Sequence, residues 1–323
     1  MPTSSPAAPP RAVRRGWARR GGALVAGVAL ALGLALGASP ARATNPELAA
    51  AASLVLPGSG QAATGSYVAG ATQFTLYFVL LNQYSKHIER PDYIPFDRRE
   101  DQTNHVIRTN RTTTVADQYA TGALDVAFYS SFSAYRDARA QPENAGRYRT
   151  PAPQETLGDL ALAPLSWEYL KRPTTLAPLL LPLYLALAPV PRDRLVLAPD
   201  DSITRGELRM RYFFQHGAVA VGEEAFYRGF LNNGLSDRFG EGWGLAGSSA
   251  LFGLSHSGQG GVQATALGAG LFGLYLGWVQ QRNGYAIGEN VAIHFWWNFL
   301  TSLALLKTHS GATVTPVQIY VRF

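Results

Sequence analysis

The C-terminal half of the chain alternates apolar segments with short glycine-rich breaks, a pattern typical of helices joined by tight turns. The predicted helices cover residues 176–190, 209–232, 243–255, 262–281 and 286–306. Because the breaks between the later segments are short, successive helices should lie antiparallel beside one another.

The N-terminal half shows a less regular pattern. A Leu-Pro-Gly-Ser-Gly-Gln sequence predicts a turn between segment 48–56, too short to cross a bilayer unaided, and segment 67–84, long enough for a span. Segment 115–135 is amphipathic and is interrupted by Asp117 and Asp125. It suits either a helix on a membrane surface or a polar helix packed among others.

The composition changes this picture by pointing to a membrane. Of 323 residues, 47% are hydrophobic and only 15% are charged, whereas soluble proteins average roughly 25% charged residues. The charges also cluster in a few hydrophilic segments. We therefore predict an all-α fold, a polytopic transmembrane helical bundle.

The net charge of +6 comes entirely from the N-terminus, where six arginines and no acidic residue precede residue 44. The remainder is neutral, which argues against a nucleic-acid partner. The arginines precede an apolar run, 21–38, and an Ala-Arg-Ala sequence ending at Ala43. This order predicts a signal peptide over 1–43, with an uncleaved signal anchor as the alternative, and placement in a bacterial inner membrane.

Candidate chemistry lies in polar residues that interrupt the apolar helices. The chain has no cysteine, so catalysis would use serine, histidine or carboxylate groups. A charged side chain at the bilayer centre costs about 2.5–3.5 kcal/mol, so such residues indicate a functional site. One alternative is helix packing through buried polar contacts. The residues concerned are Glu223, Glu224, Arg228, His256, His294 and Asn298.

Helical spacing assigns faces to these residues. Glu224 and Arg228 are four apart and can form an ion pair, while Glu223 lies about 100° around the helix and is free to face a cavity. His294 and Asn298 are also four apart and project together. His256 ends its helix, and Phe252, one turn earlier, is expected to support its ring.

The three motifs resemble the CPBP family of intramembrane proteases, which includes type II CAAX prenyl endopeptidases and bacteriocin-processing or bacteriocin-immunity proteins. The motifs are Glu-Glu-Ala-Phe-Tyr-Arg at 223–228, Phe-Gly-Leu-Ser-His at 252–256 and His-Phe-Trp-Trp-Asn at 294–298. The resemblance covers about residues 176–306. It implies that Glu223 and His256 activate water and that His294 and Asn298 stabilise the oxyanion.

The resemblance also implies supporting roles for Glu224 and Arg228. An alternative mechanism places zinc on Glu223, His256, His294 and Asn298, since carboxylate and imidazole bind zinc. The chain lacks a His-Glu-x-x-His motif, however, and we favour a reaction without a metal or other cofactor.

Two other functions compete with this hypothesis. Ser255 and Ser257 flank His256 and would allow a rhomboid-like serine protease, although the surrounding residues do not form a Gly-x-Ser-x-Gly motif. A catalytically silent scaffold or immunity protein of the same fold is the non-enzymatic alternative. For the protease, the expected partners are the lipid bilayer and a membrane-embedded or membrane-associated protein substrate.

These observations predict four regions. They are a signal peptide or anchor at 1–43, a membrane-associated region with a hydrophilic loop at 44–155, a CPBP-like protease domain at 156–310, and a tail at 311–323.

Overall fold

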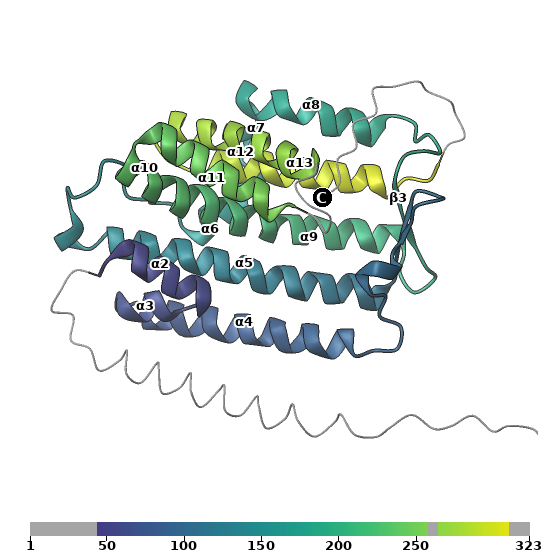
Figure 1. Ribbon diagram of the computed structural model, residues 1–323, viewed down its shortest axis with the longest axis horizontal. Helices are drawn as coiled ribbons and strands as arrows, with labels where there is room; N and C mark the ends of the chain where they lie inside the picture. Colours follow the sequence, from purple (N-terminus) through teal and green to yellow (C-terminus); the bar gives the residue numbers. More distant parts are fainter. Residues whose placement is uncertain (1–43, 258–263, 310–323) are drawn as a thin grey trace, which may run out of the picture. The chain divides into compact units, whose positions relative to one another are not determined.

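Most residues that the structure describes lie in helices (Figure 1). The structure is a computed structural model that describes residues 44–257 and 264–309. The predicted signal segment 1–43 and the predicted tail 311–323 lie outside the described residues.

The long helix α5 (Arg111–Arg139) organises the N-terminal half. It begins at Asn110, whose side chain accepts a hydrogen bond from the Thr113 backbone N–H and so satisfies one free donor of the first turn. Helices α2 (Pro46–Val55) and α4 (Tyr67–Ile88) both pack on it. The predicted amphipathic segment is therefore a polar helix packed among others.

The predicted turn in the N-terminal half joins α2 to α3 (Ser59–Ala63) and depends on glycine. Gly58 has φ +94°, and a Cβ there would lie only 2.1 Å from the carbonyl oxygen of Gly70. The buried Gln61 side chain donates to the Ser130 carbonyl at 2.7 Å and to the Ser133 hydroxyl at 2.5 Å. These bonds fix the turn to the side of α5.

Three short strands, which the sequence pattern did not predict, gather near the starts of α5 and α9 (Arg205–Glu224). Strand β2 (Val106–Thr109) pairs antiparallel with β1 (Glu100–Asp101) and parallel with β3 (Val196–Pro199). The sheet thus joins the segment before α5 to the segment before α9. Leu197 of β3 lies in a buried cluster with Leu208 of α9.

The C-terminal half contains the five predicted helices and several additional short ones. Their bounds are α6 (Leu157–Leu162), α7 (Trp167–Leu170), α8 (Pro173–Leu187), α9 (Arg205–Glu224), η4 (Ala225–Asn232), α10 (Asn233–Phe239), α11 (Glu241–Ser255), α12 (Ala264–Arg282) and α13 (Gly288–Leu305). The predicted segment 209–232 is divided, because the α-helix continues beyond Glu224 as the π-helical turn η4.

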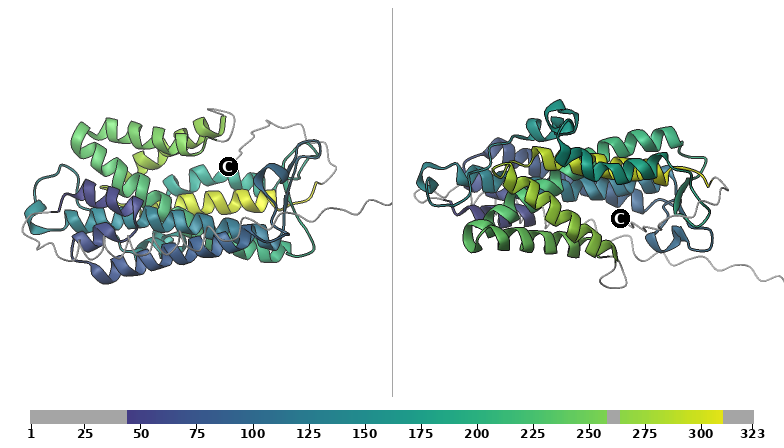
Figure 2. Two further views of the ribbon diagram at one scale, coloured as in Figure 1. Left: turned by 60° about the horizontal axis from the view of Figure 1, so that its bottom comes forward. Right: turned by 90° about the horizontal axis from the view of Figure 1, so that it is seen from above.

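The long helices form a continuous series in which each packs on the next, in the order α4, α5, α9, α13 and α8 (Figure 1). Helices α10, α11 and α12 form a separate group on one side of that series, as Figure 2 shows. Two glycines permit the contact of α5 with α9 and η4. A Cβ at Gly222 would lie 2.8 Å from the Asp125 Cα, and one at Gly229 would lie 2.4 Å from the Phe132 ring.

The all-α prediction is confirmed apart from the three short strands, but the predicted spans are not found. Among the described residues, every helix is either too short or too polar to cross a membrane. The reason differs between helices. Helices α8 and α11 have only 15 residues each, whereas α4, the predicted span of the N-terminal half, has 22 residues but includes Gln, Asn, Lys and His.

Candidate active site

The candidate site begins where α9 changes into the π-helical turn η4. The two glutamates, Glu223 and Glu224, are the last residues of α9, and Arg228 lies within η4. Isolated π-helical turns inside helices occur frequently at functional sites, because the wider turn changes the direction of nearby side chains. The Glu223 side chain is 16% exposed, whereas that of Glu224 is fully buried.

Glu224 and Arg228 form the ion pair that their spacing predicts. Arg228 Nη1 lies 3.2 Å from Glu224 Oε1, and Nη2 donates to the carbonyl oxygen of Gly273 in α12 at 3.3 Å. The guanidinium carbon is also 4.4 Å from the Phe252 ring centroid, within the range of a cation–π contact. A Cβ at Gly273 would lie 3.3 Å from Nη2 and would crowd this arrangement.

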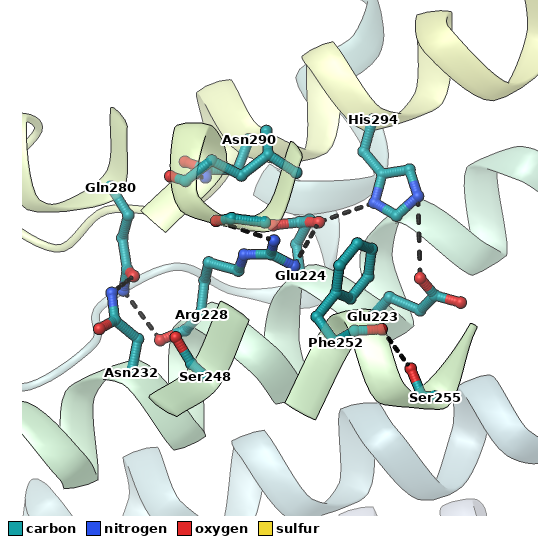
Figure 3. Close-up of polar contacts among 12 residues, drawn as sticks. Glu223, Glu224, Arg228, Asn232, Ser248, Phe252, Ser255, Gln280, Asn290 and His294 are labelled. Carbon is teal, nitrogen blue, oxygen red and sulfur yellow. Dashed lines mark hydrogen bonds and ion pairs between the residues drawn. The ribbon is translucent and has the colours of Figure 1, made fainter. Parts of the chain in front are cut away.

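His294 of α13 connects the two glutamates (Figure 3). Its Nδ1 is 2.7 Å from Glu224 Oε1, and its Nε2 is 3.8 Å from Glu223 Oε2. Because the carboxylate that pairs with Arg228 can only accept, Nδ1 carries the proton in this bond. In the neutral form of the ring, the lone pair of Nε2 then faces Glu223.

His256 approaches Glu223 from a second helix. It follows the last residue of α11, and its Nδ1 donates to the Phe252 carbonyl oxygen at 2.8 Å. A carbonyl oxygen cannot donate, so the lone pair of the neutral ring is on Nε2, 4.0 Å from Glu223 Oε2. The Phe252 ring lies 4.5 Å from the imidazole, centroid to centroid, and supports it from one side.

Both imidazole Nε2 atoms thus converge on one oxygen of Glu223. That oxygen is buried and has no hydrogen-bond partner among the described residues. The separations of 3.8 and 4.0 Å are too long for direct hydrogen bonds. Three proton acceptors around one point form a group that can remove a proton from a bound nucleophile.

The structure brings together five of the residues singled out in the sequence, namely Glu223, Glu224, Arg228, His256 and His294. Asn298 differs from them. It lies one turn after His294 on α13, but within the described residues no hydrogen bond joins its side-chain amide to this group.

Several buried polar residues around Arg228 were not predicted from the sequence (Figure 3). Gln280 donates to the Arg228 carbonyl oxygen at 2.9 Å and accepts from Asn232 at 2.6 Å. Asn290 donates to the Leu276 carbonyl oxygen at 2.5 Å. The available signal was weak: Asn290 is four residues before His294, and Gln280 is an amide near the end of an apolar helix.

The start of α13 receives a cap from the N-terminal half of the chain. The Glu155 carboxylate, in the connection after α5, accepts from the Ile287 N–H at 2.9 Å and the Gly288 N–H at 2.6 Å. Burial raises the pKa of Glu155 above its usual value, and the two N–H groups counteract part of that rise. This residue helps to set the position of the helix that carries His294.

The zinc alternative depends on three or more suitable side chains lying close together. Within 44–257 and 264–309, no three histidine, aspartate or glutamate side chains are grouped closely enough to hold a metal ion. Glu223, His256 and His294, three of the four alternative zinc ligands, converge without forming such a group.

Comparison with known proteins gives one result. A family model described as type II CAAX prenyl endopeptidase Rce1-like matches residues 207–300. No curated protein and no solved structure matches the chain significantly. The matched residues include all three motifs, and the family consists of proteases that are membrane proteins. The match over residues 207–300 therefore supports membership of the CPBP family, to which the three motifs are similar.

Proposed function

We propose that the protein is an intramembrane endopeptidase that hydrolyses a peptide bond of a membrane-embedded or membrane-associated protein, with a bacterial inner membrane as the expected location. The observation that carries this proposal is the convergence of His256 Nε2 and His294 Nε2 on Glu223 Oε2, at 4.0 and 3.8 Å. The family match supports protease chemistry in general. The roles of single residues are inferred from their contacts.

In the proposed reaction, Glu223 and His256 activate a water molecule for attack on the peptide bond. The water oxygen forms a bond to the scissile carbonyl carbon while one of its protons passes to the Glu223 carboxylate. The carbonyl oxygen becomes an oxyanion. The proton then passes to the amide nitrogen, the carbon–nitrogen bond breaks, and an acid and an amine leave. Partial burial of Glu223 favours its action as a base.

We assign oxyanion stabilisation to His294 with Asn298. When the proton taken up by Glu223 is shared with Nε2 of His294, 3.8 Å away, on its way to the amide nitrogen, the positive ring is balanced by Glu224, which is 2.7 Å from Nδ1. Nε2–H can then donate to the oxyanion, and a preorganised donor of this kind contributes about 2.7–4 kcal/mol. The contacts support His294 in this role more directly than Asn298.

The serine-protease alternative receives less support from the contacts. The Ser255 hydroxyl donates to the Phe252 carbonyl oxygen at 2.8 Å, and the Ser257 hydroxyl donates to that of Leu254 at 2.6 Å. Both hydroxyls bond to carbonyl groups of α11, and the Nε2 of His256 faces Glu223 instead.

The central test compares the membrane peptides that accumulate in cells producing wild-type protein or the Glu223→Gln variant. We expect Glu223→Gln to reduce cleavage at least about 100-fold, the lower range for loss of a general base. The Ser255→Ala/Ser257→Ala double variant is the matched control and should retain activity. Equal peptide profiles for wild type and Glu223→Gln would favour the silent scaffold, and loss of activity in the serine variant would favour the rhomboid-like mechanism.

A second experiment addresses the metal. Purified protein that is exhaustively treated with a chelator should keep its activity under the proposed mechanism. Loss of activity that added zinc restores would contradict it and would favour zinc bound by Glu223, His256 and His294.

A further inference from the structure

A large apolar cavity lies on the other side of α9 from the candidate site. It has a volume of about 770 Å³ and is bounded by α4, α5, α6 and α9, by Pro164 and Leu165 just after α6, and by one residue of α13. Pockets of about 300–1,000 Å³ hold typical small-molecule ligands. Most of the lining is aliphatic or aromatic, including Leu76, Leu80, Val126, Phe213, Phe214 and Phe295.

Asp125 is the unusual member of this lining. Only 6% of the residue is exposed, and its Oδ2 has no hydrogen-bond partner among the described residues. A buried carboxylate without a partner is costly, so such groups are normally paired with a cation. The Glu223 carboxylate also repels a negative charge on Asp125.

The basic side chain in the cavity wall does not compensate for Asp125. Arg136 is 11 residues further along α5, about 16 Å at 1.5 Å per residue. It is paired with Asp137 at 2.9 Å and also donates to the Glu155 carbonyl oxygen. Burial raises the pKa of Asp125 well above its usual value, and the lining residues offer its carboxylate no positive partner.

The cavity is separate from the reaction centre. At about 100° per residue, Glu223 lies roughly half a turn around α9 from the middle of the cavity-lining positions. The wall between the two sites is thin at Gly222, where a Cβ would lie 2.8 Å from the Asp125 Cα. A ligand in the cavity would therefore not reach the groups assigned to catalysis. A positive charge on it would, however, offset the repulsion between Asp125 and Glu223.

We infer that this cavity binds a small single-chain amphiphile with a primary ammonium group, whose apolar chain fills the cavity and whose ammonium pairs with Asp125. The apolar lining matches the chain, and the unpaired carboxylate matches the charge. The inference does not depend on the proposed protease activity, because it concerns binding alone.

Trp296 provides a natural reporter for this site. Its indole N–H donates at 2.9 Å to the carbonyl oxygen of Pro164, a residue of the cavity wall. Quenching of tryptophan fluorescence by ω-brominated dodecylamine, dodecanol and dodecanoate can therefore be measured with purified full-length protein. The Trp296→Phe variant identifies the part of the signal that comes from Trp296.

We expect the wild type to bind the amine roughly tenfold or more tightly than the alcohol, as for a hydrogen bond to a charged group, and to bind dodecanoate least. Asp125→Asn should lower the affinity for the amine to that for the alcohol. Retained binding of the alcohol by this variant would show that the cavity is intact.

A second pair of variants tests the location. An added side chain at Gly217, a cavity residue, meets no atom within 4 Å at its Cβ, so Gly217→Leu should fill the space and abolish quenching by all three probes. Gly206→Leu, on an exposed position of the same helix, is the matched control and should leave binding unchanged. The inference fails if no probe binds, if Asp125→Asn keeps the preference for the amine, or if Gly217→Leu leaves quenching intact.

Discussion

Glu224 is a fully buried carboxylate that contacts two other polar side chains of the site. Its Oε1 interacts with both Arg228 and His294, and all three side chains are at most 3% exposed. A buried charge that loses its partner is left uncompensated, whereas removal of both charges together has a smaller effect. Glu224 should therefore affect stability as well as activity.

We predict that Glu224→Gln lowers the free energy of unfolding by about 3–5 kcal/mol, because it leaves the Arg228 guanidinium buried without a counter-charge. Chemical denaturation of purified protein in detergent measures this change. The Glu224→Gln/Arg228→Met double variant should recover part of the loss. If the double variant were less stable than the single one, the broken ion pair would not explain the destabilisation by Glu224→Gln.

Much of the site could be anticipated at the residue scale. The spacing of Glu224 and Arg228 predicts their pair, and the separation of Glu223 from Glu224 around the helix predicts that they make different contacts. The cap from Glu155 could not be anticipated, because it joins residues 132 positions apart in the sequence.

At the scale of elements, the contact of α5 with α9 depends on small residues at the crossing. Gly222 and Gly217 lie on the same helix, but their surroundings differ. A Cβ at Gly222 would overlap the Asp125 backbone, while one at Gly217 meets no atom within 4 Å.

These two glycines therefore form a matched pair for mutagenesis. Gly222→Ala should destabilise the protein by about 1–3 kcal/mol through overpacking. Gly217→Ala should stabilise it by about 0.5–1 kcal/mol, because alanine is the better helix former. The free energies of unfolding of both variants test the packing of α5 against α9, and equal effects would contradict it.

The cap on α13 predicts a pH dependence. Because the pKa of Glu155 is raised in the folded protein, the folded state binds its proton more tightly than the unfolded state does. The stability that this group contributes is complete below its unfolded pKa and decreases as the pH rises through its folded pKa.

The difference in unfolding free energy between wild type and Glu155→Gln should therefore decrease as the pH rises above the usual glutamate value of 4.5. Denaturation at several pH values measures it. Glu143→Gln, in the same connection, is the control. A difference that grows with pH would show that the N–H groups of Ile287 and Gly288 outweigh burial.

At the scale of the whole molecule, the matched family region 207–300 is not structurally independent of what precedes it. Phe128 of α5 stacks on Phe226 with ring centroids 4.6 Å apart, and Phe132 belongs to the same buried cluster as Ala220 and Val221. Without α5, these apolar side chains would face solvent or lipid.

We predict that a fragment of residues 156–323 produced alone is unstable and inactive, and that co-production with residues 44–155 restores both stability and cleavage. Co-purification of the two fragments, followed by the peptide comparison described for Glu223→Gln, tests this. A stable, active 156–323 fragment would show that α5 is not needed for the site.

The sequence by itself determined the helical class, the approximate positions of the C-terminal helices and the motif residues of the site, because helix periodicity and i, i+4 spacing are local properties. Only the tertiary structure decided how α5 packs against α9, that Glu155 caps α13, and that Asp125 lies unpaired in a cavity. These features depend on contacts between residues far apart in the chain. Local patterns do not encode them, since the same residues could pack against several different neighbours.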